Sequence, residues 1–135
     1  MDNKFEILEH KADLKIKAFG KDKKELFLNM LLGMTAALRP ELKAQNVKRK
    51  IKIISIDLPT LLVDFLSEVL YQTQVNKEVY NNVKFKKFTD FEIEAEIFGQ
   101  KVVRFGEDIK AVTYHNLEVK QKKDGSWEAI ALFDI

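Results

Sequence analysis

The sequence predicts an α+β fold in which two helices pack on a mostly antiparallel or mixed sheet. Several segments alternate apolar and polar residues with a period of two, and two others carry apolar residues at helical spacing. The predicted order is strand, strand, helix, strand, helix and then four strands, and this segregation favours α+β architecture. Because no repeat, low-complexity tract or Pro/Gly-rich linker interrupts the 135 residues, we expect one compact domain over residues 1–135.

Three strands are expected in the N-terminal half. Residues 5–8 are short and apolar, and residues 13–20 alternate so that Asp13 opens the polar face of a half-buried strand. Residues 47–57 form the third candidate, and its basic run is considered below.

Two helices are expected between these strands and after them. Asp22 and Glu25 have the spacing of a capping box, so the first helix begins there and stops at Pro40. Pro59 suits the first turn of the second helix, where its missing N–H has no cost.

Four strands are expected in the C-terminal half. Residues 83–88 and 91–97 form one neighbouring pair, and residues 109–120 and 127–133 bracket a hairpin turn at 123–126. The last strand has apolar residues on both faces, which predicts a central position in the sheet.

Two glycines in this half are interpreted as turn residues. Gly99 and Gly106 flank a short apolar segment, so the strand at 91–97 is expected to end before Gly99.

Composition excludes several classes of function. There is no cysteine, which rules out disulfides, zinc–thiolate sites and cysteine nucleophiles. Basic and acidic residues nearly balance at 23 and 21, so the bulk charge gives little support for nucleic-acid binding. No apolar run approaches membrane-spanning length, and we expect a cytoplasmic protein without membrane contact.

An acidic group is expected where the two ends of the chain meet. Asp13, Asp134 and the terminal carboxylate of Ile135 offer only oxygen ligands, which suit a divalent cation such as calcium. The structural alternative is that Asp13 caps a turn and Asp134 is a solvated strand end.

Three further residues are candidates for a supporting or partner-contacting role. His10 lies three residues before Asp13 and is either a ligand, an orienting group or a satisfied polar residue at a turn. His115 shares a strand face with Thr113, and this periodicity predicts a buried, hydrogen-bonded histidine. Lys110 is expected on the opposite face, either holding an anion, offsetting the acidic group or simply solvated.

A basic strand at residues 48–52 has two explanations. It could track a phosphate backbone, which is the basis for an alternative function as a small RNA-binding module. The rival explanation is cross-strand pairing with Glu92, Glu94 and Glu96, and we favour it because no aromatic residues alternate with the lysines. No nucleophile elbow, phosphate-binding glycine loop or zinc motif is present.

Four blocks of the sequence resemble the archease family. Residues 9–16, EHKADLKI, resemble its opening signature, and residues 65–71, FLSEVLY, resemble its second-helix pattern. Residues 109–115, IKAVTYH, and the ending FDI at 133–135 match two more of its segments, in the same order. Together the blocks span nearly the whole chain.

The resemblance implies a protein cofactor and not a free-standing enzyme. Archeases assist the RtcB-type RNA ligase of tRNA splicing and RNA repair, promoting guanylylation of the ligase's active-site histidine and multiple turnover. The family's metal site carries over to Asp13, Asp134 and Ile135, with calcium as the expected cation. Lys11 and Lys15 depart from the family pattern by placing two extra positive charges beside Asp13.

A divalent-metal hydrolase is a third hypothesis, weakened by the lack of a general base.

Overall fold

The structure is a computed structural model, and it describes residues 3–9 and 12–135. Nine elements follow in the order that the sequence predicts. They are β1 (Phe5–Glu9), β2 (Asp13–Gly20), α1 (Lys23–Ala37), β3 (Pro40–Ile54), α2 (Leu58–Asn76), β4 (Glu78–Phe88), β5 (Glu92–Phe105), β6 (Ala111–Gln121) and β7 (Trp127–Asp134).

The strands divide into two antiparallel sheets, a division that the sequence did not predict. One sheet has the order β1-β2-β7-β6 and the other has the order β3-β5-β4. β7 lies between β2 and β6, which confirms that the last strand is central.

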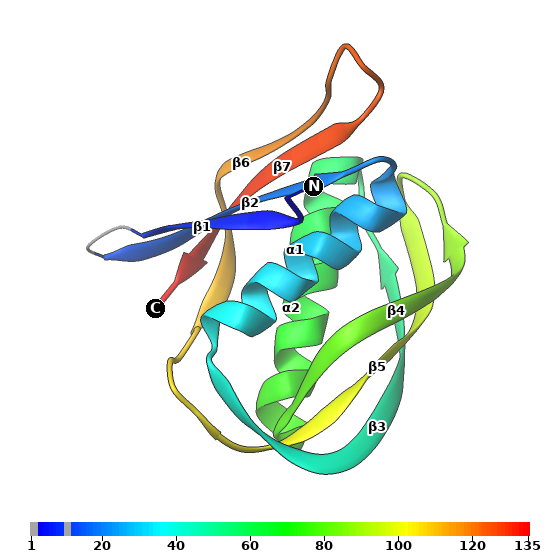
Figure 1. Cartoon of the computed structure of the whole chain (residues 1–135). Coiled ribbons are helices and arrows are strands. Elements are labelled where there is room, and N and C mark those ends of the chain that lie inside the picture. The colour runs from blue at the N-terminus through cyan, green and yellow to red at the C-terminus, as the bar shows by residue number, and fades with distance from the viewer. Residues whose placement is uncertain (1–2, 10–11) are drawn as a thin grey trace.

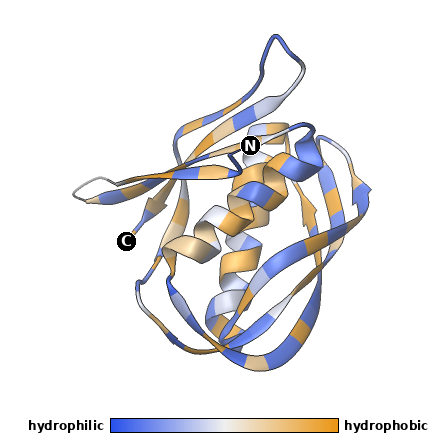
Figure 2. Ribbon diagram, in the orientation of Figure 1, coloured by the Kyte–Doolittle hydropathy of each residue, from blue (hydrophilic) through white to orange (hydrophobic). Residues whose placement is uncertain are grey.

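The two helices lie between the sheets and confirm the α+β class (Figure 1). In Figure 2 the hydrophobic residues of α1 and α2 gather along the interior of the molecule, while the strands alternate in colour. Four phenylalanine rings join the layers. The ring centroid of Phe27 in α1 lies 5.6 Å from that of Phe65 in α2 and 5.0 Å from that of Phe88 in β4. Phe85 of β4 packs against both Phe65 and Phe88. The phenylalanine-rich composition therefore serves the contact between helices and sheet.

Side-chain caps fix the start of both helices. Asp22 accepts a hydrogen bond from the backbone N–H of Glu25 at 2.8 Å, and Asp57 accepts one from Thr60 at 2.9 Å. The Glu25 carboxylate in turn accepts from the backbone N–H of Lys21, the residue before the N-cap, so the reciprocal contact of a capping box is displaced by one residue.

Three strands are markedly longer than predicted. β4 begins at Glu78, five residues before its predicted start. β3 begins at Pro40, directly after α1, and β5 continues to Phe105. Gly99 therefore lies inside β5, and its interpretation as a turn residue is wrong. A Cβ at Gly99 would lie 1.8 Å from the carbonyl oxygen of Val79, so glycine is required by the close approach of β4.

Among the described residues, no helix is both long enough and apolar enough to cross a bilayer.

Candidate functional site

Asp13 and Asp134 lie directly opposite each other in the antiparallel ladder of β2 and β7. β2 buries Leu14, Ile16 and Ala18, so Asp13 belongs to the opposite, solvent-facing side of the strand. Directly opposed residues have their Cβ atoms about 4.5–5.5 Å apart on the same face of a sheet. The fold thus places Asp13 and Asp134 opposite each other at the ends of their strands.

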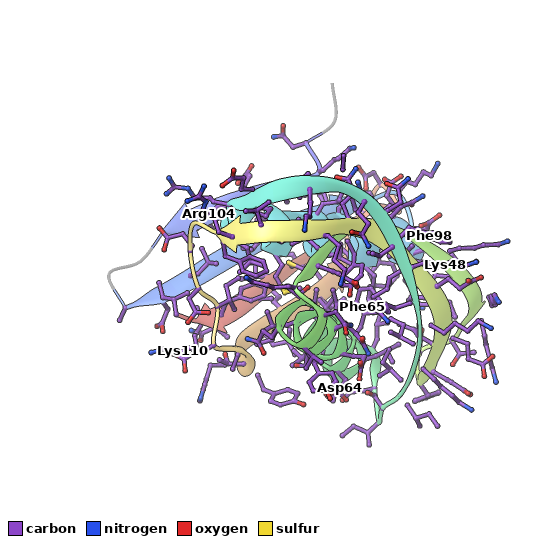
Figure 3. All side chains as sticks on the ribbon, turned by 90° about the horizontal axis from the view of Figure 1, so that it is seen from below. Lys48, Asp64, Phe65, Phe98, Arg104 and Lys110 are labelled. Carbon is purple, nitrogen blue, oxygen red and sulfur yellow. The ribbon has the colours of Figure 1, made fainter. Side chains whose placement is uncertain are left out.

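The segment before β6 holds the end of β7 in place. The backbone N–H of Lys110 donates to the carbonyl oxygen of Asp134 at 2.7 Å, and Ala111 pairs with Asp134 in the ladder. Asp134 therefore has β2 on one side and β6 on the other. The side chain of Lys110, the residue whose backbone makes this contact, is exposed (Figure 3).

Two cavities meet at Asp13. The larger, about 880 Å³, is lined by Asp13, Asp134 and His115, with Thr113 and Leu132 between them. It gives the carboxylate pair an open approach from solvent.

The smaller cavity, about 200 Å³, brings further acidic residues to Asp13. Its lining includes Glu107, Asp108 and Ile135. Sequence reasoning missed Glu107 and Asp108 because they lie between β5 and β6, in a stretch without periodicity. Their adjacency to the strand end at residues 109–111 was the available signal.

The prediction that His115 is buried is wrong, because His115 is exposed. The ladder of β6 and β7 shifts register between Thr113 and Glu118, and Asn116 adopts a positive φ of 53°. This bulge breaks the alternation on which the prediction was based, and it turns His115 toward the larger cavity.

His10 and Lys11 lie outside the described residues, so their predicted roles stay predictions. Lys15 lies two residues after Asp13 on β2, on the same face of the strand. It is the one described lysine of the two that depart from the family pattern.

The carboxylate pair fits a cation only in part. Among residues 3–9 and 12–135, no three His, Cys, Asp or Glu residues are placed to hold a metal ion. Asp13 and Asp134 supply two side-chain donors of the hard-oxygen type that calcium accepts. A cation here would need further oxygen ligands from the terminal carboxylate of Ile135, from water or from a bound partner.

The basic strand at residues 48–52 lies on the other sheet, where Figure 3 shows Lys48 beside Phe98 and far from Lys110. Lys52 pairs with Glu92 and Glu94 at 3.8 and 3.6 Å, as cross-strand pairing predicts. The guanidinium of Arg49 donates two hydrogen bonds to the carboxylate of Glu78. These contacts support the structural explanation of the basic strand over the RNA-binding alternative.

Comparison with known proteins matches the chain to one family. The model of the Archease protein family matches residues 5–135. The chain is 36% identical to a protein archease of Methanosarcina barkeri, over 97% of this chain and 95% of the relative. It is 28% identical to a protein archease of Pyrococcus furiosus, over 97% and 98% of the two chains.

Two solved structures share the fold. The solution structure of protein 1598 of Methanobacterium thermoautotrophicum superposes with a TM-score of 0.72 at 24% identity, covering 98% of this chain and 99% of the other. The crystal structure of an archease of Thermotoga maritima, described as a possible chaperone, gives a TM-score of 0.69 at 18% identity. It covers 95% of this chain and 94% of the other.

Proposed function

Given that this chain belongs to the archease family, we propose that it activates an RtcB-type RNA ligase in tRNA splicing and RNA repair. In this role it is a protein cofactor and supplies no nucleophile. It promotes guanylylation of the ligase's active-site histidine and so supports multiple turnover. In this role the protein acts in the cytoplasm, and the ligase brings it into indirect contact with the RNA substrate.

The observation that carries the proposal is the opposition of Asp13 and Asp134 on an open face of the sheet. Like charges directly opposite each other in a ladder destabilise the fold. A positive charge bound between the two carboxylates would relieve this repulsion, so the pair favours a cationic partner. Strand pairing on both sides of Asp134 holds its backbone in position before any partner arrives. A preorganised anionic site of this kind stabilises positive charge without reorganising at the moment of reaction.

The cation that we propose for the site is calcium, held by Asp13, Asp134 and the terminal carboxylate of Ile135. Bound there, it would neutralise the carboxylates and attract the phosphates of a nucleotide. The two side-chain donors alone leave its coordination incomplete. We therefore propose that the ligase or its nucleotide contributes the remaining ligands, so that the metal site is completed in the complex.

Two residues are proposed to support the site. Lys110 lies beside Asp134 with an exposed side chain that can contact acidic groups of the ligase. His115 lines the larger cavity and is placed to contact the same partner.

The test is guanylylation of the cognate ligase with GTP, measured with and without this protein. We expect the wild type to stimulate multiple turnover. Stimulation by Asp134→Asn should be at least about tenfold weaker, because the variant loses a charge-assisted contact. Glu94→Gln, which removes the same charge from the other sheet, is the matched control and should stimulate normally. Equal stimulation by Asp134→Asn and wild type would show that the carboxylate pair is not the functional site, and no stimulation by wild type would reject the activator function.

A further inference from the structure

A separate cavity opens at the opposite end of the β2–β7 pair from the carboxylates. It has a volume of about 660 Å³ and is lined by residues of the N-terminal segment, the end of β2, the first half of α1 and the β6–β7 hairpin. Trp127 pairs with Gly20 at this end of the ladder, whereas Asp13 pairs with Asp134 at the other. At about 3.3 Å per residue, the length of β2 separates the two sites by about 23 Å.

Lysine side chains without acidic partners line this cavity. Lys21 and Lys122 are exposed, and within the described part of the chain neither has a carboxylate oxygen within 4.0 Å. On the same sheet, Lys17 and Lys120 both pair with Glu128, at 3.6 and 3.2 Å. Lys21 and Lys122 are thus available to an anion.

The carboxylates of the two acidic residues in the cavity wall accept hydrogen bonds from residues close to them in sequence. Glu25 accepts the backbone N–H of Lys21 at 3.0 Å. Asp124 accepts the backbone N–H of Ser126 at 2.9 Å and its hydroxyl at 2.6 Å, inside the hairpin turn. With Lys4 as a third lysine of the lining, positive side chains outnumber negative ones around the cavity.

Trp127 supplies a fixed aromatic surface beside the lysines. Its indole is half-buried, and the ammonium of Lys23 lies 5.2 Å from the ring centroid. The carboxylate of Asp90, in the connection between β4 and β5, lies 2.6 Å from that ammonium and holds it in place. Aromatic side chains next to lysines are the combination on which nucleotide bases stack.

A polar group from α1 completes the wall. The side chain of Asn29 is 5% exposed, and its Nδ2 donates to the carbonyl oxygen of Phe19 at 2.6 Å. Its Oδ1 accepts no hydrogen bond from any described residue, although Asn29 lines the cavity. An amide oxygen in this position can accept from a base N–H or a ribose hydroxyl.

We propose that this cavity binds a phosphorylated nucleotide, with the phosphate between Lys21 and Lys122 and the base against Trp127. The same chemistry is offered by a free mononucleotide and by the terminal nucleotide of an RNA strand. The site is distinct from the carboxylate pair and requires no ligase, so the proposal does not depend on the activator function.

Trp127 is the one tryptophan in the sequence, which makes its fluorescence a local reporter. The isolated protein is titrated with GMP, with guanosine, with inorganic phosphate and with a short 5′-phosphorylated oligoribonucleotide, corrected for absorption by the nucleotide. We expect saturable quenching by GMP or by the oligoribonucleotide, and none by guanosine at the same concentrations. Quenching by both ligands identifies the nucleotide itself as sufficient, and quenching by the oligoribonucleotide alone identifies an RNA end as the ligand.

The variant Lys21→Ala/Lys122→Ala removes the phosphate contacts at two exposed positions. We expect its affinity to fall by about tenfold or more, because charge-assisted hydrogen bonds are the strong ones. The matched control is Lys48→Ala/Lys50→Ala, which removes the same charge from the other sheet and should bind like wild type. Absence of quenching by every phosphate-bearing ligand, equal quenching by guanosine and GMP, or equal loss in the two double variants would each overturn the proposal.

Discussion

Arg49 of β3 holds both carboxylate oxygens of Glu78, at 3.0 and 2.8 Å, at the start of β4. The Glu78 side chain is fully buried and also accepts from the hydroxyl of Tyr80 at 2.8 Å, while the ammonium of Lys101 lies 3.1 Å away. These three donors belong to β3, β4 and β5, so one buried carboxylate joins all strands of the smaller sheet. Removing one partner of such a buried ion pair is strongly destabilising, because the other charge is left without a partner.

The first prediction concerns removal of this charge. Glu78→Gln should lower the free energy of unfolding by about 2–4 kcal/mol, since Arg49 and Lys101 lose their partner but remain partly solvated. Urea denaturation at neutral pH measures the change. The control is Glu94→Gln, an exposed ion pair whose loss should cost less than about 1 kcal/mol. Similar costs for the two variants would show that the buried network contributes little.

The second prediction concerns pH. Burial raises the pKa of Glu78, but hydrogen bonds from Arg49, Tyr80 and Lys101 outweigh burial and lower the pKa from 4.5 to about 2. Because the folded-state pKa lies below the unfolded one, the stabilisation is present above pH 4.5 and is lost as the pH falls toward 2. The shift corresponds to stabilisation on the order of 3 kcal/mol.

Denaturation of wild type and Glu78→Gln at a series of pH values measures this effect. The difference in stability between the two proteins should be constant above pH 4.5 and shrink between pH 4.5 and 2. A difference that stays unchanged across that range would contradict the lowered pKa.

The third prediction concerns Gly99. Gly99→Ala would place a Cβ against the backbone of Val79 and Tyr80, which cannot rotate away, so β4 and β5 must separate locally. We expect a loss of about 3 kcal/mol or more in unfolding free energy. Gly125→Ala is the comparison, since Gly125 has a φ of 90° but nothing within 4 Å of an added Cβ. It should cost only about 1 kcal/mol, and a cost as large as that of Gly99→Ala would contradict the close approach.

The fourth prediction concerns the carboxylate pair in the absence of any ligase. Asp134→Asn should raise the melting temperature in chelator, because it relieves a like-charge contact worth up to about 1 kcal/mol. The same substitution should remove any stabilisation of the wild type by added calcium, measured as a thermal shift. If the variant and the wild type melt alike in chelator and respond alike to calcium, the two side chains neither repel nor share a cation.

The order of all nine elements could be predicted because the periodicity of this sequence is clear. β2 was predicted over the residues that form it, since its alternation begins at Asp13 and ends at Gly20. The extension of β5 was missed because glycine is typical of turns. Gly99 is required instead by the close approach of β4, which is a tertiary contact that the local sequence does not show. The division into two sheets was missed for the same reason, because local pattern does not specify which strands pair.

The candidate site was predictable at its strand ends and not elsewhere. Asp13 and Asp134 were found because each lies at the end of a segment whose alternation predicts a strand, and because the resemblance to the archease family assigns both to one site. His115 was placed in the wrong environment because a bulge changes the face of a residue without changing its sequence neighbours. Asp108 was missed because loop residues carry no periodic signal.

The central position of β7 has a consequence for how the chain reaches this fold. β2 ends at Gly20 and β7 begins at Trp127, so β2 has only β1 as a neighbour in its sheet while most of the polypeptide is synthesised. During that interval one edge of the early hairpin offers free N–H and C=O groups to other nascent molecules. Closure of such a distant strand pair is intrinsically slow, and folding yield should therefore decline as the concentration of newly made chains increases.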